Sequence, residues 1–191
     1  MASPTTLLQN SFLTPTTFLA AASNADIIHY HGHASFSSSP STQSLILSPS
    51  QTPLSASSLF ALNLGSRSSL VTVIACNSGK QDIGAGDEPL GLVSAFLFAG
   101  ATSVVGTMWA IASEDGRQFS ERFYRDLISS SKAKTEEGTR KKGLVNVAEA
   151  IRRTVVAMID GEELESDGLT RDSPYHWAGF FVQGAWQFQL G

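Results

Sequence analysis

Short apolar runs alternate with amphipathic segments along the 191-residue chain. Runs rich in β-branched and aliphatic side chains favour buried strands, and they occupy residues 25–30, 69–76 and 102–109. Segments with a polar start, or with apolar positions three and four residues apart, favour helices and occupy residues 14–23, 55–62, 89–100, 113–127 and 144–160. Strands separated by helices imply parallel pairing through right-handed crossovers. The pattern therefore predicts an α/β fold with a mostly parallel sheet and helices on both faces.

The remaining segments are predicted to lie at the margins of this fold. Residues 45–47 suit a short edge strand, and residues 177–188 favour a final strand or hairpin interrupted at Gly184. Residues 129–143 carry mixed charges and no apolar side chain larger than Ala133, which is typical of a solvated loop. The length suits one sizeable domain, so residues 1–191 are interpreted as a single domain.

The composition argues against several classes of protein. A net charge of −4 disfavours nucleic-acid binding, which requires a strongly basic face. The apolar runs are too short for a membrane helix, which needs about 18 or more such residues. The N-terminal segment lacks a basic start and is interrupted by Pro15, so a helix capped by Thr14 explains it better than a secretory signal. We therefore expect a cytoplasmic protein without a membrane or nucleic-acid partner.

The histidines raise the question of a metal site. Three of the four histidines are His29, His31 and His33, and the chain has one cysteine, Cys76. In a strand these three would share one face at steps of about 7 Å, which is wide for imidazoles closing on one zinc ion. No second cluster of ligands is evident, and no glycine-rich phosphate loop precedes a helix. The sequence thus predicts neither a metal nor a cofactor.

Two predicted strands end in chemically capable residues, IIHYHGH at His33 and TVIAC at Cys76. The carboxyl ends of parallel strands meet at one edge of a sheet, so we expect the two side chains to face each other there. A lone cysteine is often only a small buried side chain, but beside a histidine it becomes a nucleophile. The backbone N–H groups of Ala34 and Cys76 would then be available to form an oxyanion hole.

An ordered set of motifs carries a family resemblance. The segments HYHGHA, VIACNSGKQDIGAGDEPLGLVSAFLFAGATSVVGTMWAI, FSERFYRDL, VNVAEAI and SPYHWAGFFVQG together resemble the CHAT domain. That family consists of caspase-like cysteine proteases related to separases, and its domains are often found behind TPR repeats. The resemblance covers about residues 5 to 188 and implies a caspase-like sheet. It also implies a protein substrate, and TPR or other sensor domains upstream in a longer chain.

The resemblance assigns roles to individual residues. The histidine after the glycine in the family's H-x-x-G-H-G pattern is catalytic, which is His33 here, and the A-C-x-S/T-G element places the nucleophile at Cys76. Trp109 matches the tryptophan that closes the next strand. His29 matches the first histidine of the pattern and is interpreted as structural, and His31 receives no role.

The chain departs from the family pattern in three ways. Ala34 replaces the usual glycine after the catalytic histidine, and Ser113 replaces the usual aspartate four residues past the tryptophan. The chain also begins at the helix before the histidine strand. Leading strands of the full domain are therefore expected to be absent, leaving a catalytic portion whose first strand has an unpaired or poorly covered edge.

The expected function is that of a cysteine endopeptidase acting on a partner protein through His33 and Cys76. Asp82, Trp109 and Asp115 are candidates for substrate binding, because they lie near the predicted site and a carboxylate pairs well with a basic side chain. His176 is interpreted as a surface or packing residue. The alternative is a catalytically silent CHAT interaction module within a larger signalling protein.

Overall fold

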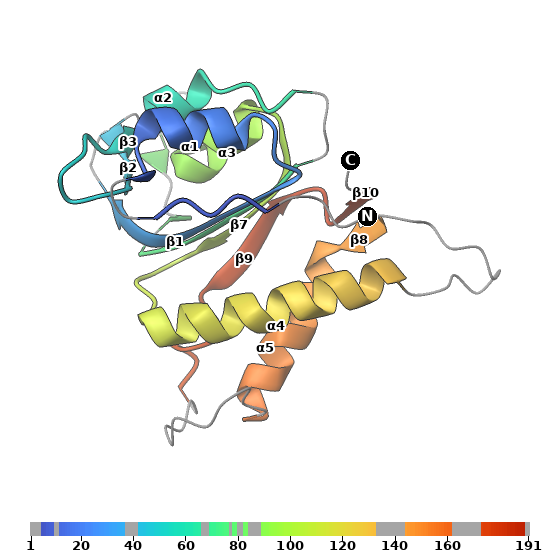
Figure 1. Ribbon diagram of the computed structural model, residues 1–191. Helices are drawn as coiled ribbons and strands as arrows, with labels where there is room; N and C mark the ends of the chain where they lie inside the picture. The colour runs from blue at the N-terminus through green and yellow to red at the C-terminus, as the bar shows by residue number, and fades with distance from the viewer. Residues whose placement is uncertain are drawn as a thin grey trace.

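A six-stranded sheet forms the centre of the computed structural model (Figure 1). The structure describes residues 5–9, 12–36, 42–65, 69–76, 78–79, 82–83, 89–132, 144–161 and 173–189. In the described part of the chain the strand order is β3-β2-β1-β4-β7-β9. The bounds of these strands are β1 Ile27–Ser35, β2 Ser44–Ile46, β3 Leu54–Ser55, β4 Ser69–Ala75, β7 Ala101–Thr107 and β9 Phe180–Gly184.

The three central strands are parallel, as the sequence predicts. β1 pairs with β4, and β4 pairs with β7, both in parallel. β2 and β3 add to one side in antiparallel fashion, and β9 adds antiparallel to the other side. All seven residues of β4 are buried, because this strand lies in the middle of the sheet and is covered on both faces.

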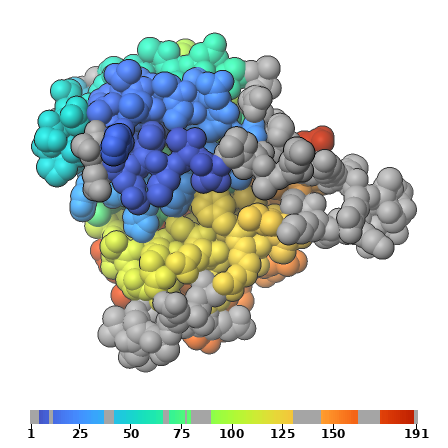
Figure 2. Space-filling view, in the orientation of Figure 1, coloured from blue at the N-terminus to red at the C-terminus, as the bar shows by residue number. Residues whose placement is uncertain are grey.

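Helices cover both faces of the sheet, and this prediction is confirmed (Figure 1). One face carries α1 (Pro15–Ala22), α2 (Ala56–Phe60) and α3 (Leu92–Phe98), and the other carries α4 (Ser113–Lys132) and α5 (Val147–Ile159). Figure 2 shows the blue N-terminal residues above the yellow α4 on the visible face of the molecule. Of the described helices, none has both the length and the apolar character needed to cross a membrane.

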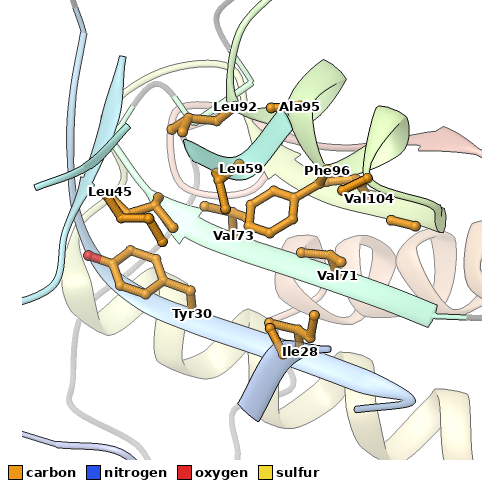
Figure 3. Packing of buried hydrophobic residues seen from close by; sticks show 14 of the residues in the cluster. Ile28, Tyr30, Leu45, Leu59, Val71, Val73, Leu92, Ala95, Phe96 and Val104 are labelled. Carbon is orange, nitrogen blue, oxygen red and sulfur yellow. The ribbon is translucent and has the colours of Figure 1, made fainter. Parts of the chain in front are cut away.

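Each face has its own hydrophobic core. On the α1–α3 side, Ile28 and Tyr30 of β1 pack with Val71 and Val73 of β4 and with Phe96 of α3 (Figure 3). On the α4–α5 side the core is rich in phenylalanine, with members that include Phe119, Phe123, Phe180 and Phe188. Alternate residues of each strand therefore contribute to opposite cores, as the period of two in a strand requires.

Helix starts follow the capping signals in the sequence. Thr14 caps α1 with its side chain, and Pro15 is the first helical residue. Ser55 caps α2 in the same way. The α5 helix begins at Val147 rather than at Leu144, because Asn146 is its cap and accepts a hydrogen bond from the N–H of Glu149 at 2.9 Å.

Several predicted element bounds are wrong. Residues 144–146 form β8 (Leu144–Asn146), which pairs with β10 (Gln187–Gln189) in a separate two-stranded sheet. Pro89 lies in β6 (Pro89–Leu90), paired with β5 (Asp82–Ile83), instead of opening α3. The α4 helix continues to Lys132 into the segment predicted as a loop, and β2 lies inside the sheet rather than at its edge. Residues 133–143 of that loop lie outside the described residues.

The outer side of β1 is paired only at its carboxyl end. β2 pairs with His33, Ala34 and Ser35, and no described residue pairs with the outer side of residues 27–32. The Asp26 carbonyl accepts a hydrogen bond from the Leu70 N–H at 2.9 Å. Backbone direction alternates along a parallel strand. The N–H and C=O groups of the even-numbered residues of β1 therefore point toward β4, and those of odd-numbered residues such as His29 point away from it.

Candidate active site

His33 and Cys76 lie together just past the residues through which β1 and β4 pair. The last paired residues of β1 and β4 are Gly32 and Ala75, and His33 and Cys76 follow them directly. Both residues line a pocket of about 200 Å³. The nine residues that line it are His31, Gly32, His33, Ile74, Ala75, Cys76, Ile111, Ala112 and Ser113. The structure therefore brings the lone, half-buried cysteine and the candidate histidine to one cavity.

The backbone after Cys76 is held by two buried hydroxyl groups. The Ser78 hydroxyl donates to the carbonyl of Val73 at 2.7 Å and accepts from the N–H of Thr107 at 2.9 Å. The Thr107 hydroxyl donates to the carbonyl of Ala75. Ser78 and Thr107 are both 0% exposed, so these bonds form away from water. The turn that presents Cys76 is thus fastened to the end of β7.

Gly79 completes this turn for a steric reason. A Cβ atom at this position would lie 2.0 Å from Cε1 of Phe181 and 3.1 Å from the Thr107 carbonyl. The Gly79 N–H donates to that carbonyl at 2.9 Å. Only glycine lets the turn approach both β7 and the aromatic ring of β9 at this distance.

Tyr30 supports the histidine side of the pocket from the opposite face of β1. Its hydroxyl lies 2.8 Å from the carbonyl oxygen of His33 and 2.9 Å from that of Ile46, so it bridges β1 and β2. A Cβ atom on Gly32 would lie 2.7 Å from this hydroxyl, which explains the glycine. Burial raises the pKa of Tyr30 to about 12, so the hydroxyl keeps its proton for these contacts.

His29 contacts a buried threonine and a tyrosine and does not line the pocket. Its Nδ1 lies 2.9 Å from Oγ1 of Thr72 and 3.2 Å from the hydroxyl of Tyr124. The His29 side chain keeps exposed surface, and partial desolvation of its ring, together with the neighbouring His31, lowers its pKa to about 4. These contacts agree with the structural role predicted for His29.

His31 is a pocket residue to which the sequence interpretation gave no role. It lies two residues before His33 on the same face of β1, so it lies beside Ile74, two residues before Cys76 on β4. Burial lowers its pKa, which keeps the imidazole neutral at pH 7. The period of two along HYHGHA was the signal that could have found it.

The third wall of the pocket comes from the loop between β7 and α4. Ile111, Ala112 and Ser113 contribute to the wall. The indole N–H of Trp109 donates to the Tyr175 carbonyl at 3.0 Å, and the rings of Trp109 and Tyr175 stack at 6.1 Å. Trp109 is therefore close in sequence to the pocket-forming residues Ile111, Ala112 and Ser113 but does not line the pocket itself. Its contacts with Tyr175 link this loop to a segment far along the chain.

Asp115 and Asp82 are the two acidic candidates for substrate binding. Asp115 is 2% exposed as a whole residue, and its carboxylate accepts a hydrogen bond from Nδ1 of His176 at 2.7 Å. It does not line the pocket, and His176 has a specific buried partner that the sequence did not predict. Asp82 is in β5, paired with Leu90, and its side chain lies outside what the structure describes.

The described residues contain no group of three or more His, Cys, Asp or Glu side chains that could hold a metal ion. The chemical resources of the pocket are therefore a thiol, two imidazoles, one hydroxyl and backbone amides. Such a set is suited to nucleophilic attack on a carbonyl group.

Solved structures of cysteine proteases have the same fold. A separase–securin complex from Saccharomyces cerevisiae aligns over 92% of this chain with a TM-score of 0.56 and 15% identity. The Arg-specific cysteine proteinase gingipain R aligns over 93% with a TM-score of 0.63 and 12% identity, and a complex of Porphyromonas gingivalis RgpB pro- and mature domains over 91% with 0.64 and 13%. The aligned part is 9% of the separase chain and 36% of each gingipain chain.

The parallel sheet, its helices and these likenesses define a caspase-like α/β domain with the fold of cysteine proteases. The CHAT domain family matches residues 2–185, so the chain belongs to that family. No curated protein sequence gives a significant match.

Proposed function

We propose that the protein is a cysteine endopeptidase that cleaves partner proteins through Cys76 and His33. The observation that carries the proposal is that His33 and Cys76 directly follow the last residues through which β1 and β4 pair in parallel, and that both line one pocket. The cysteine-protease fold and the CHAT family support it. Among the described residues, no hydrogen bond joins the Cys76 thiol to the His33 imidazole. This is compatible with the proposal, because the hydrogen bond of a catalytic pair is often long or poorly aligned before substrate binds.

The reaction follows from the two side chains. His33 accepts the thiol proton, and the Cys76 sulfur attacks the carbonyl carbon of the substrate peptide, forming a C–S bond. The imidazolium then donates its proton to the leaving amine as the C–N bond breaks. A water molecule, deprotonated by His33, attacks the acyl-enzyme, releases the carboxylic acid and restores the thiol.

The oxyanion would be stabilised by the backbone N–H groups of Cys76 and Ala34. Ala34 lies within β1, opposite Leu45 of β2, in an extended conformation that alanine adopts as readily as glycine. The replacement of glycine by Ala34 is therefore compatible with this role. By strand alternation the Ala34 N–H, like those of the other even-numbered residues, points toward the β4 side.

The test combines thiol labelling with peptide cleavage. We expect wild type to react with iodoacetamide at Cys76, its single cysteine, at least tenfold faster at pH 7 than His33→Ala, because His33 promotes thiolate formation. A protein substrate or peptide library cleaved by wild type should be left intact by Cys76→Ala.

His29→Gln is the matched control, since it removes a histidine of the same strand that does not line the pocket. It should label at the wild-type rate. Equal labelling of wild type and His33→Ala, with no cleavage that depends on Cys76, would reject the proposal and favour an interaction module.

A further inference from the structure

The pocket extends beyond the two candidate catalytic residues. Ile74 and His31 precede Cys76 and His33 by two residues on the same faces of their strands, so they lie one pleat further from the strand ends. A Cβ atom on Gly116 of α4 would lie 2.6 Å from Cγ2 of Ile74 and 3.3 Å from Nε2 of His31. Gly116 of α4 therefore packs closely against Ile74 and His31, and this contact leaves no room for a side chain.

The described lining is uncharged apart from the catalytic pair. Ile74, Ile111 and Ala112 supply apolar surface, and Ser113 supplies a hydroxyl group. Burial lowers the pKa of His31, so its imidazole is neutral at pH 7 and can donate or accept one hydrogen bond.

The two acidic residues next to the pocket have other partners. Glu114 accepts hydrogen bonds from Arg117 at 2.6 and 3.1 Å. Asp115 is buried and bound to His176, and neither acid lines the pocket. A lysine, arginine, aspartate or glutamate side chain entering the pocket would lose its water without gaining an opposite charge from the described lining.

We propose that this pocket receives the side chain of the substrate residue before the scissile bond, and that it selects an uncharged one. This assignment rests on the endopeptidase activity proposed above. Aliphatic side chains would contact Ile74 and Ile111, and serine or threonine would also reach the hydroxyl of Ser113 or the imidazole of His31. Basic and acidic side chains are rejected because they would be desolvated without a partner.

The first test uses peptidyl acyloxymethyl ketones that differ only in the last residue: leucine, threonine, arginine or aspartate. The Cys76 sulfur displaces the carboxylate of each probe, so a C–S bond forms as the C–O bond breaks, and the adduct is measured by intact mass. We expect leucine and threonine probes to react at least tenfold faster than arginine and aspartate probes. Faster reaction of a charged probe would overturn the inference.

A binding measurement separates this inference from the proposed function. In Cys76→Ala, which has no nucleophile, peptides with the same four residues at that position are titrated by calorimetry. Tenfold tighter binding of the leucine and threonine peptides supports the pocket assignment even if no probe reacts with wild type, which would reject only the catalytic proposal. No discrimination in either measurement rejects the pocket assignment.

Ser113 offers a charge-reversal test. It is exposed at the start of α4, where an acidic residue is compatible with the helix dipole, so Ser113→Asp and the neutral Ser113→Asn should both fold. Ser113→Asp should raise the arginine-to-leucine rate ratio at least tenfold, whereas Ser113→Asn should leave it near the wild-type ratio. An unchanged ratio in Ser113→Asp would show that the selected side chain does not enter this pocket.

Discussion

At the scale of single residues, the setting of Cys76 depends on side chains that do not line the pocket. Ser78 and Thr107 satisfy three backbone groups around the cysteine turn, and Gly79 leaves room for the ring of Phe181. Each of these residues is short, because the turn, β7 and β9 approach one another closely. The position of the thiol is therefore decided by packing behind the pocket rather than inside it.

The histidines of β1 make the stability of the protein depend on pH. The pKa of His29 falls from an ordinary value of 6.5 to about 4 in the folded chain, mainly because of burial. Between these pH values the unfolded chain binds a proton that the folded chain excludes, so stability falls as the pH drops from about 6.5 toward 4 and is unaffected above 6.5. Urea unfolding across pH 4.5 to 7.5 should show this decline in wild type.

His29→Gln should flatten that decline, because glutamine keeps a hydrogen-bonding group beside Thr72 without a titrating ring. A smaller slope should remain from His31, whose pKa is lowered in the same direction. Identical pH dependence in wild type and His29→Gln would contradict this account.

Reasoning from the sequence located Cys76 and His33 because each follows an apolar strand, and parallel strands end at the same edge of a sheet. It gave His31 no role because roles were assigned from the family pattern, which often has a small residue at this position, whereas alternation along β1 places His31 on the same face as His33. It could not anticipate the Asp115–His176 bond, since those residues are 61 positions apart and meet only through tertiary packing.

At the scale of elements, α4 is linked to the segment before β9. His176 binds Asp115 of α4, and the Met108 N–H donates to the Gly179 carbonyl at 2.8 Å. The Asp115 side chain is 3% exposed, whereas Arg153, which pairs with Glu149, is 55% exposed. Burial makes the first bond far more costly to break than the second.

We therefore expect His176→Ala to lower the free energy of unfolding by about 1–3 kcal/mol, because a buried carboxylate loses a hydrogen-bond donor. Arg153→Ala should cost only about 0–0.5 kcal/mol, since its ion pair is exposed to water. Denaturant unfolding at pH 7 measures both. An equal loss of unfolding free energy in the two variants would show that the buried Asp115–His176 bond contributes no more to stability than the exposed ion pair.

The bounds of elements were predicted less well than their existence. Leu144 and Val145 fit the apolar stripe of a helix, but pairing with β10 takes them into β8 and leaves Asn146 as the cap. Pro89 suits the first turn of a helix, yet it pairs with Ile83 in a short hairpin. In both cases strand pairing, with a partner 43 positions away for Val145 and six positions away for Pro89, outweighed the helix preference of the residue.

At the scale of the whole molecule, the two sides of the parallel part of the sheet are paired to different extents. β9 borders β7 on one side, while on the other side β2 reaches only the last three residues of β1. We expect the amides of His29 and His31, which point to the unpaired side, to exchange with solvent faster than that of Tyr30, which points to β4. Hydrogen exchange followed by NMR resolves the alternation.

Residues 70–72 of β4 provide the internal comparison, because they pair with both β1 and β7 and their amides should be protected at successive positions. Uniform protection along residues 27–32 would mean that another stretch of polypeptide covers that side of β1.

The attachment of the pocket wall has a consequence for synthesis of the protein. Trp109 and Asp115 bracket the pocket-forming loop, and their partners Tyr175 and His176 come 66 and 61 positions later. A chain emerging from the ribosome exposes His33 and Cys76 long before those partners. The reactive groups thus precede the wall that would receive a substrate, and a nascent chain should bind no substrate until Tyr175 and His176 have emerged.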